Sequence, residues 1–199
     1  MNANFDPNAE LLDAAAVGDA DRVRTALQNG AQIETRDDHE RTALLLAATY
    51  DHVDAARVLI ASGADPDALD DRHDTPWLVT GVTGSVAMLE VLLPAKPDLT
   101  IRNRFGGVAV IPASHRGHVD YVARVVQTDI DVNHVNDPGW TALLEAVILG
   151  DGGERYQQIV QILLDAGADP TIADNEGVTP LELARVHGYD EIVRILTPA

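Results

Sequence analysis

The chain has 199 residues, 46% of them hydrophobic, so it is long and apolar enough to bury a sizeable core. It contains no cysteine, which excludes disulfides, a thiolate nucleophile and cysteine-ligated zinc. Its formal net charge of -18 and its pI near 4.4 argue against nucleic acid and anionic membranes as partners. We find no apolar run as long as a membrane span and no signal peptide, and we therefore expect a cytoplasmic protein.

A repeat with a fixed period runs through the chain. Thr42, Thr75, Val108 and Thr141 follow one another at intervals of 33 residues. A second set of segments keeps the same interval until its phase jumps by five residues. These segments are Gly30-Ala31, Gly63-Ala64-Asp65-Pro66, Lys96-Pro97-Asp98-Leu99, Asp129-Ile130-Asp131-Val132 and, after the jump, Gly167-Ala168-Asp169-Pro170. A fixed period near this length predicts a stacked solenoid.

Two helices are expected in each repeat, and the first begins after the threonine. Threonine caps the free amides of a helix start, and Pro76 and Pro180 then occupy the first helical position, where no hydrogen-bond donor is lost. Thr179 and Glu182 have the spacing of a capping box. Gly63 is expected to adopt the left-handed conformation that ends a second helix, and Gly167 does the same in a later repeat.

The apolar residues differ between the two helices of a repeat. Alanines such as Ala47 and Ala146 are expected to keep the first helices thin, so that successive repeats stack closely. The second helices carry bulky apolar residues at helical spacing, among them Leu59, Leu89 and Leu163. This pattern predicts one continuous core.

Two stretches depart from the pattern. Val108 takes the place of threonine and Pro112 lies inside the same helix, which is therefore expected to start late or to be kinked. Two prolines replace the glycine turn just before it, in the segment 93–98, and stiffen that connection. The five-residue jump falls in residues 150–156, where three glycines predict a flexible loop or a loosened helix start. A lid and a tolerated surface insertion are both open interpretations of it.

Several motifs resemble the ankyrin repeat signature. They are Thr42-Ala43-Leu44-Leu45-Leu46-Ala47-Ala48, Thr75-Pro76-Trp77-Leu78, Thr179-Pro180-Leu181-Glu182-Leu183-Ala184, Gly117-His118-Val119-Asp120 and the Gly-Ala-Asp-Pro segments. The resemblance implies an all-α ankyrin-repeat solenoid of about six helix-turn-helix repeats with finger-like turns. Its repeats would be 8–36, 37–69, 70–102, 103–135, 136–173 and 174–199, with a flexible N-terminal tail at 1–7. Thirteen arginines against the single Lys96 favour a bacterial source. The stretches Pro94-Ala95-Lys96-Pro97-Asp98 and Arg104-Phe105-Gly106-Gly107 resemble small bacterial single-domain ankyrin repeat proteins.

The resemblance also implies a function. Ankyrin-like stacks are non-enzymatic protein-protein interaction modules, in which finger-like turns and the exposed face of the first helices form a concave groove. We expect a monomer without cofactor or metal that binds a protein partner of unknown identity, with acidic first fingers that favour a basic or mixed partner. The candidate partner-binding residues are Tyr50, Arg72, Arg104, Phe105, His115, Arg116, Trp140 and Glu145. Phe105 and Trp140 fall at finger positions, where an aromatic ring either anchors a partner or packs back onto the next repeat.

Other function classes stay open. His39 and His73 lie in acidic fingers, and histidine with carboxylates could hold an ion in a metal-dependent or enzymatic protein. A pocket under the glycine-rich insertion would fit a small-molecule sensor. No catalytic residue is assigned, because Ser114 and His115 are neighbours on a helix and do not face each other. The structural interpretation of His52, a hydrogen bond to loop backbone, is preferred to a ligand role.

Overall fold

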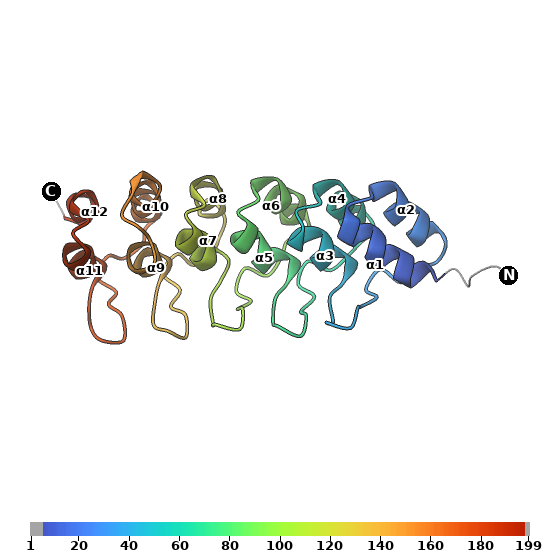
Figure 1. The fold of residues 1–199 in the computed structure, drawn as a ribbon, viewed down its shortest axis with the longest axis horizontal. Helices are drawn as coiled ribbons and strands as arrows, with labels where there is room; N and C mark the ends of the chain where they lie inside the picture. Colours follow the sequence, from blue (N-terminus) through green and yellow to red (C-terminus); the bar gives the residue numbers. More distant parts are fainter. Residues whose placement is uncertain (1–5, 198–199) are drawn as a thin grey trace. The chain divides into compact units, whose positions relative to one another are not determined.

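The structure, a computed structural model, describes residues 6–197 and is built from α-helices joined by loops (Figure 1). Within that range there are twelve α-helices, one 3-10 helix and no extended strand, which confirms the predicted all-α class. The helices are α1 (Pro7–Val17), α2 (Ala20–Gln28), α3 (Ala43–Thr49), α4 (Val53–Ala61), α5 (Pro76–Thr83), α6 (Val86–Leu92), η1 (Leu93–Ala95), α7 (Val110–Arg116), α8 (Val119–Val125), α9 (Ala142–Ile148), α10 (Glu154–Asp165), α11 (Pro180–His187) and α12 (Asp190–Leu196).

The chain divides into two compact units, residues 1–98 and 99–199. In the first unit α1 contacts α3 and α3 contacts α5, while the second helices α2, α4 and α6 contact one another in order. The second unit repeats this arrangement, with α7, α9 and α11 in one row and α8, α10 and α12 in the other. In each unit the loops that precede the first helices extend away from the helical layers (Figure 1). We call the loops 37–41, 70–74, 103–107, 136–140 and 174–178 the finger loops.

The predicted helix starts are confirmed. The Oγ1 atoms of Thr42, Thr75 and Thr141 accept hydrogen bonds from the backbone N–H three residues later, over 3.2, 3.1 and 3.2 Å. Thr179 does the same and forms the expected capping box with Glu182, whose carboxylate accepts from the Thr179 backbone N–H over 2.8 Å. Because these bonds satisfy amides that lack an intrahelical partner, each threonine fixes where its helix begins.

The packing follows the sequence pattern within each unit. Ala47 and Ala146 of the first helices are fully buried, which allows neighbouring first helices to approach closely. Leu59, Leu89 and Leu163 of the second helices are fully buried as well. Burial of such side chains is the main favourable term in folding, so stability within each unit comes from contacts between neighbouring repeats.

The first helix of the fourth repeat, α7, starts late, as predicted. The 33-residue period places its first residue at Ala109, but α7 begins at Val110 and Ala109 makes no side-chain capping bond. Pro112 is the third residue of α7, where an N–H has no intrahelical acceptor, so the proline is accommodated without a lost hydrogen bond. Before it, Lys96 has a φ of 55°, the left-handed conformation that Gly63 adopts in the equivalent turn.

The insertion differs from the expected flexible loop or loosened helix start. Its residues extend the following helix, since α10 has 12 residues and α8 has 7. The short turn before α10 is fixed by hydrogen bonds, because Tyr189 Oη donates to the Gly150 carbonyl over 2.9 Å and Gln157 Nε2 donates to the Gly152 carbonyl over 2.8 Å. The glycines serve close packing, and a Cβ on Gly150 would meet the Ala146 carbonyl oxygen at 2.2 Å.

The boundary between the expected N-terminal tail and the first helix also differs from the prediction. Residues 1–5 of the expected tail lie outside the described residues. Asp6 accepts a hydrogen bond from the Asn8 backbone N–H over 2.9 Å, and α1 begins at Pro7. The last two residues of the expected tail are therefore the cap and the first residue of a helix.

Candidate functional site

The finger loops share one local design. Each begins with an aspartate or asparagine whose side-chain oxygen accepts backbone hydrogen bonds from residues further along the loop. In the loop before α7, Asn103 Oδ1 accepts from Phe105 over 2.9 Å and from Gly107 over 3.0 Å. In the loop before α9, Pro138 has no N–H to donate, and Asn136 Oδ1 accepts from Trp140 over 2.8 Å. The side chains that project from these loops therefore stand on a fixed backbone.

Neighbouring finger loops are also joined to one another inside each unit. In the second unit, the Asp137 backbone N–H donates to the Phe105 carbonyl over 3.0 Å, and Asn175 Nδ2 donates to the Pro138 carbonyl over 2.9 Å. His134 Nε2 lies 2.7 Å from the Gly106 carbonyl oxygen. These bonds link successive loops, so little ordering of the loops is needed before a partner binds.

Two of the candidate residues form an exposed aromatic and cationic pair. Phe105 is 54% exposed as a residue, although a phenyl ring normally gains free energy from burial. The guanidinium carbon of Arg104 lies 4.6 Å from the centre of the Phe105 ring, which is the geometry of a cation-π contact. Trp140 is half-buried, so part of this residue is covered by its neighbours and part remains open to solvent.

Glu145 lies in α9 and is almost completely buried. Asn136 Nδ2 donates to Glu145 Oε1 over 2.9 Å, and the second oxygen, Oε2, lies 3.6 Å from His115 Nδ1 on α7. Burial raises the pKa of Glu145 to about 7, and the hydrogen bond from Asn136 opposes this rise. Burial also lowers the pKa of His115, helped by the positive charge of Arg116. The geometry brings His115, Asn136 and Glu145 together at the base of the finger loop that carries Trp140.

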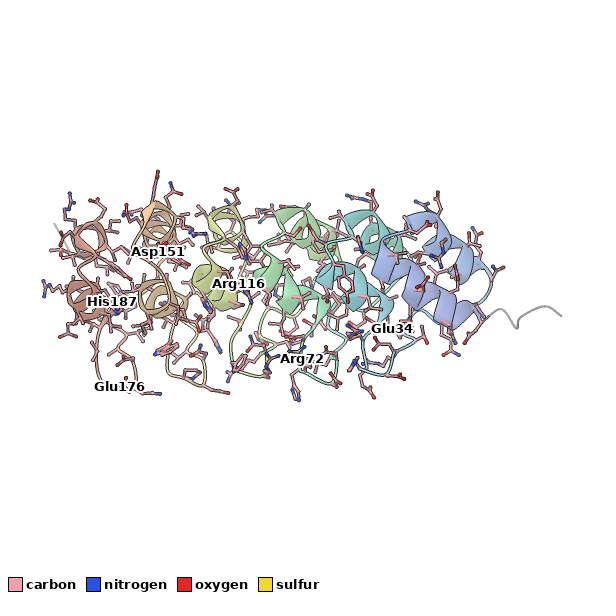
Figure 2. The ribbon with its side chains drawn as sticks, in the orientation of Figure 1. Glu34, Arg72, Arg116, Asp151, Glu176 and His187 are labelled. Carbon is pink, nitrogen blue, oxygen red and sulfur yellow. The ribbon has the colours of Figure 1, made fainter. Side chains whose placement is uncertain are left out.

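Arg116, labelled in Figure 2, is the exposed last residue of α7 and directly follows His115 in the sequence. The other two candidates belong to the first unit, where Tyr50 is 51% exposed after α3 and Arg72 is exposed in the finger loop before α5 (Figure 2). The structure thus places six of the eight candidates in the second unit. We call the exposed surface of the loops 103–107 and 136–140 and of the ends of α7 and α9 the finger face of the second unit.

Asn136 is the one member of this site that sequence analysis missed. Two signals were available. The equivalent first residue is an aspartate in three of the other finger loops, and Glu145 occupies a helical position that holds Leu46 in α3, Val79 in α5 and Leu183 in α11. Asn136 thus stands at a loop position that usually holds an aspartate, and Glu145, nine residues later, stands at a helical position that usually holds an apolar residue. This combination indicates that the two side chains pair.

The metal hypothesis finds no support in the acidic finger loops. His39 Nδ1 lies 3.2 Å from Asp71 Oδ2, but Asp37 is occupied by a hydrogen bond of 2.8 Å from Arg41 Nε. Across residues 6–197 no group of three or more potential ligand residues is arranged to hold an ion. His52 Nε2 lies 3.1 Å from the Ala16 carbonyl oxygen, so the expected backbone contact is present, but its acceptor belongs to the last turn of α1 and not to a loop. In the same range, no helix is both long and apolar enough to cross a membrane.

Comparison with known proteins gives one consistent result. The sequence matches the family described as ankyrin repeats (3 copies) at residues 11–103, 79–174 and 113–199. It is 44% identical over 192 residues to the ankyrin repeat protein YahD of Escherichia coli (strain K12), which covers 96% of both chains. An ankyrin repeat domain from Acinetobacter baumannii AYE superimposes with a TM-score of 0.90 at 46% identity, covering 94% of this chain and 95% of that one. The ankyrin repeat protein EF0377 superimposes with a TM-score of 0.92 at 38% identity, covering 97% and 98% of the two chains.

Proposed function

Because the chain belongs to the ankyrin repeat family, whose folds generally mediate protein-protein interactions, we propose that it is a non-enzymatic, cytoplasmic module that binds a protein partner through the finger face of its second unit. Fold alone supports only the general role, since one fold carries many functions. The particular surface must be argued from its residues.

The exposed Phe105 ring with Arg104 against it is the observation that carries the proposal. A large aromatic side chain that remains in water forgoes the free energy of burial, and a partner that covers it recovers that free energy. The ring has few torsions to immobilise, and its loop is held by side-chain and backbone hydrogen bonds, so the entropic cost of binding is small.

The surrounding residues suit the rim of such a contact. Arg116 offers a planar guanidinium that can bind a carboxylate or a backbone carbonyl of the partner, and His115 adds an imidazole. Trp140 contributes part of its ring from the neighbouring finger loop. In the first unit, Tyr50 is an exposed aromatic residue and Arg72 an exposed arginine, and we include both as secondary contacts with the partner. The acidic finger loops of that unit favour a partner with basic segments.

Affinity capture from the native cell tests the proposal. The wild type, the double variant Phe105→Ala/Trp140→Ala and the control Gln161→Ala are immobilised in parallel. Gln161 is exposed on α10, outside the finger face, so its truncation leaves the proposed surface unchanged. We expect proteins that the wild type and the control recover to be lost with the double variant. Recovery of the same proteins by all three baits would contradict the proposed surface.

A further inference from the structure

Burial of Glu145 disfavours the folded state when its carboxylate is ionised. Its side chain is only 10% exposed, and the equivalent positions of α3, α5 and α11 hold Leu46, Val79 and Leu183. A buried carboxylate loses its hydration, which must be replaced by hydrogen bonds or an opposite charge. A carboxylate kept where an aliphatic side chain would fit indicates a role other than packing.

Among the described residues, only one of the two oxygens of the Glu145 carboxylate accepts a hydrogen bond of good geometry. Oε1 accepts the hydrogen bond from Asn136, whereas Oε2 is 3.6 Å from His115 Nδ1, too far for a good hydrogen bond. Burial and the charge of Arg116 lower the pKa of His115, which disfavours the imidazolium that could compensate the carboxylate. Within the described residues, Oε2 therefore lacks the cation that a buried carboxylate usually has.

We infer that Glu145 receives a cationic side chain, lysine or arginine, from a protein partner, in a position prepared by Asn136 and His115. This inference rests on the proposed function and names the chemistry of one contact within it. The Asn136 side chain donates to the Glu145 carboxylate and accepts from the Trp140 backbone N–H. One side chain therefore fixes both the orientation of the carboxylate and the conformation of the finger loop. The half-buried Trp140 ring on this loop offers an apolar surface for the aliphatic stem of a lysine or arginine.

A protein side chain fits this position better than a free metal ion. A divalent cation needs several oxygen or nitrogen ligands, and within residues 6–197 no group of three or more potential ligand residues surrounds Glu145 or any other position. A lysine or arginine brings its own hydrogen-bond donors and needs one carboxylate. The net charge of -18 adds a long-range attraction for a basic segment.

The test is selection from a random peptide library displayed on phage, with the whole protein as target. The selection is run at about 0.3 M NaCl, where attraction between distant charges is largely screened. Individual peptides are then measured against the wild type, Glu145→Gln, Phe105→Ala/Trp140→Ala and the control Glu154→Gln. The affinities are measured at pH 8, above the pKa of about 7 of Glu145, so that Glu145→Gln and Glu154→Gln change the formal net charge about equally. Glu154 is exposed at the start of α10.

We expect selected peptides to share a lysine or arginine and to lose at least tenfold in affinity for Glu145→Gln, with less than twofold change for Glu154→Gln. Replacement of that basic residue by norleucine or citrulline should cause the same loss for the wild type and none for Glu145→Gln. Peptides that depend on Phe105 and Trp140 but not on Glu145 would overturn the inference and leave the proposed function standing. Absence of binders, or binding that none of the variants weakens, would overturn both.

Discussion

Asn136 Nδ2 donates a hydrogen bond to Glu145 Oε1 over 2.9 Å and thereby joins a finger loop to the helix that follows it. The side-chain oxygen of Asn136 accepts from the Trp140 backbone N–H, so a single amide side chain serves the loop and the carboxylate together. An aspartate, which begins three of the other finger loops, could serve the loop but could not donate to Glu145. The bond to Glu145 therefore requires an amide at residue 136, although an amide is not confined to this pair, since Asn103 begins the loop before α7 with Pro112 in the equivalent helical position.

The raised pKa of Glu145 predicts a pH-dependent stability. The folded pKa of about 7 lies above the ordinary value of 4.5, so the folded protein binds this proton more tightly than the unfolded chain does. The resulting stabilisation is complete below pH 4.5 and is lost as the pH rises through 7. Glu145→Gln keeps an acceptor for Asn136 and cannot ionise. We expect it to exceed the wild type in unfolding free energy by up to about 3 kcal/mol at pH 8.

Denaturant unfolding at pH 5 and pH 8 checks this expectation. At pH 5 the two proteins should differ little, because Glu145 is largely protonated in the folded state. A stability difference that is the same at both pH values would show that Glu145 does not titrate as the structure indicates. Glu154→Gln, an exposed change of the same kind, controls for net charge.

Asn136→Asp should destabilise the second unit through Glu145. The variant keeps the oxygen that accepts from Trp140, but it removes the amide donor and places a second carboxylate beside Glu145. We expect a loss of about 2 kcal/mol or more at pH 8, where both carboxylates would be ionised, and a smaller loss at pH 5. Adding Glu145→Leu should remove most of the loss. Equal losses in the wild-type and Glu145→Leu backgrounds would refute the coupling, as measured by a double-mutant cycle.

Lys96 is predicted to be a mild source of strain in the first unit. Its φ of 55° is a conformation that a side chain with a Cβ adopts at a cost, and the equivalent Gly63 has a φ of 89°. Lys96→Gly should raise the unfolding free energy by roughly 0.5 to 1 kcal/mol. The reverse change, Gly63→Ala, should lower it by about 1 kcal/mol, since a Cβ there meets no atom within 4 Å and backbone strain is the main cost. A destabilised Lys96→Gly variant in thermal melting would contradict this account.

Ala47→Leu tests the close packing of the first helices. Ala47 is fully buried in α3, which contacts α1 and α5, so three added carbon atoms must displace a neighbour. We expect a loss of roughly 1 to 3 kcal/mol in unfolding free energy. Thr49→Leu, an exposed position at the end of the same helix, should change stability by less than about 0.5 kcal/mol. Similar effects of the two substitutions would show that α3 is not tightly packed.

The features that the sequence predicted well are set by local chemistry. Threonine caps such as Thr42, the capping box at Thr179 and the left-handed glycines each act within a few residues, so the helix starts and ends can be read from neighbouring positions. The constant period then predicts the solenoid, because each repeat must bury its apolar side against the next.

The features that it predicted less well depend on the packing of distant residues. Glu145 was a candidate, but its contacts with His115 and Asn136 arise only when α7, α9 and the finger loop pack together. The insertion was expected to be a flexible loop or a loosened helix start, because glycine usually loosens a chain. In the folded protein Gly150 instead permits close packing beside Ala146, and buried Tyr156 anchors the added turn of α10 through a bond of 2.9 Å to the His115 carbonyl.

The central claim is that the finger face of the second unit binds the partner, and calorimetry with Phe105→Ala tests it most directly. Titration uses the partner recovered by the wild-type protein, and Gln161→Ala serves as the control. Phe105 is 54% exposed, so its truncation should leave the fold intact while it removes an anchor of the contact. We predict that Phe105→Ala raises the Kd about 30-fold, equivalent to about 2 kcal/mol, and that Gln161→Ala changes it less than about twofold. An unchanged Kd for Phe105→Ala, together with a large loss for Gln161→Ala, would place the binding surface elsewhere and contradict the account.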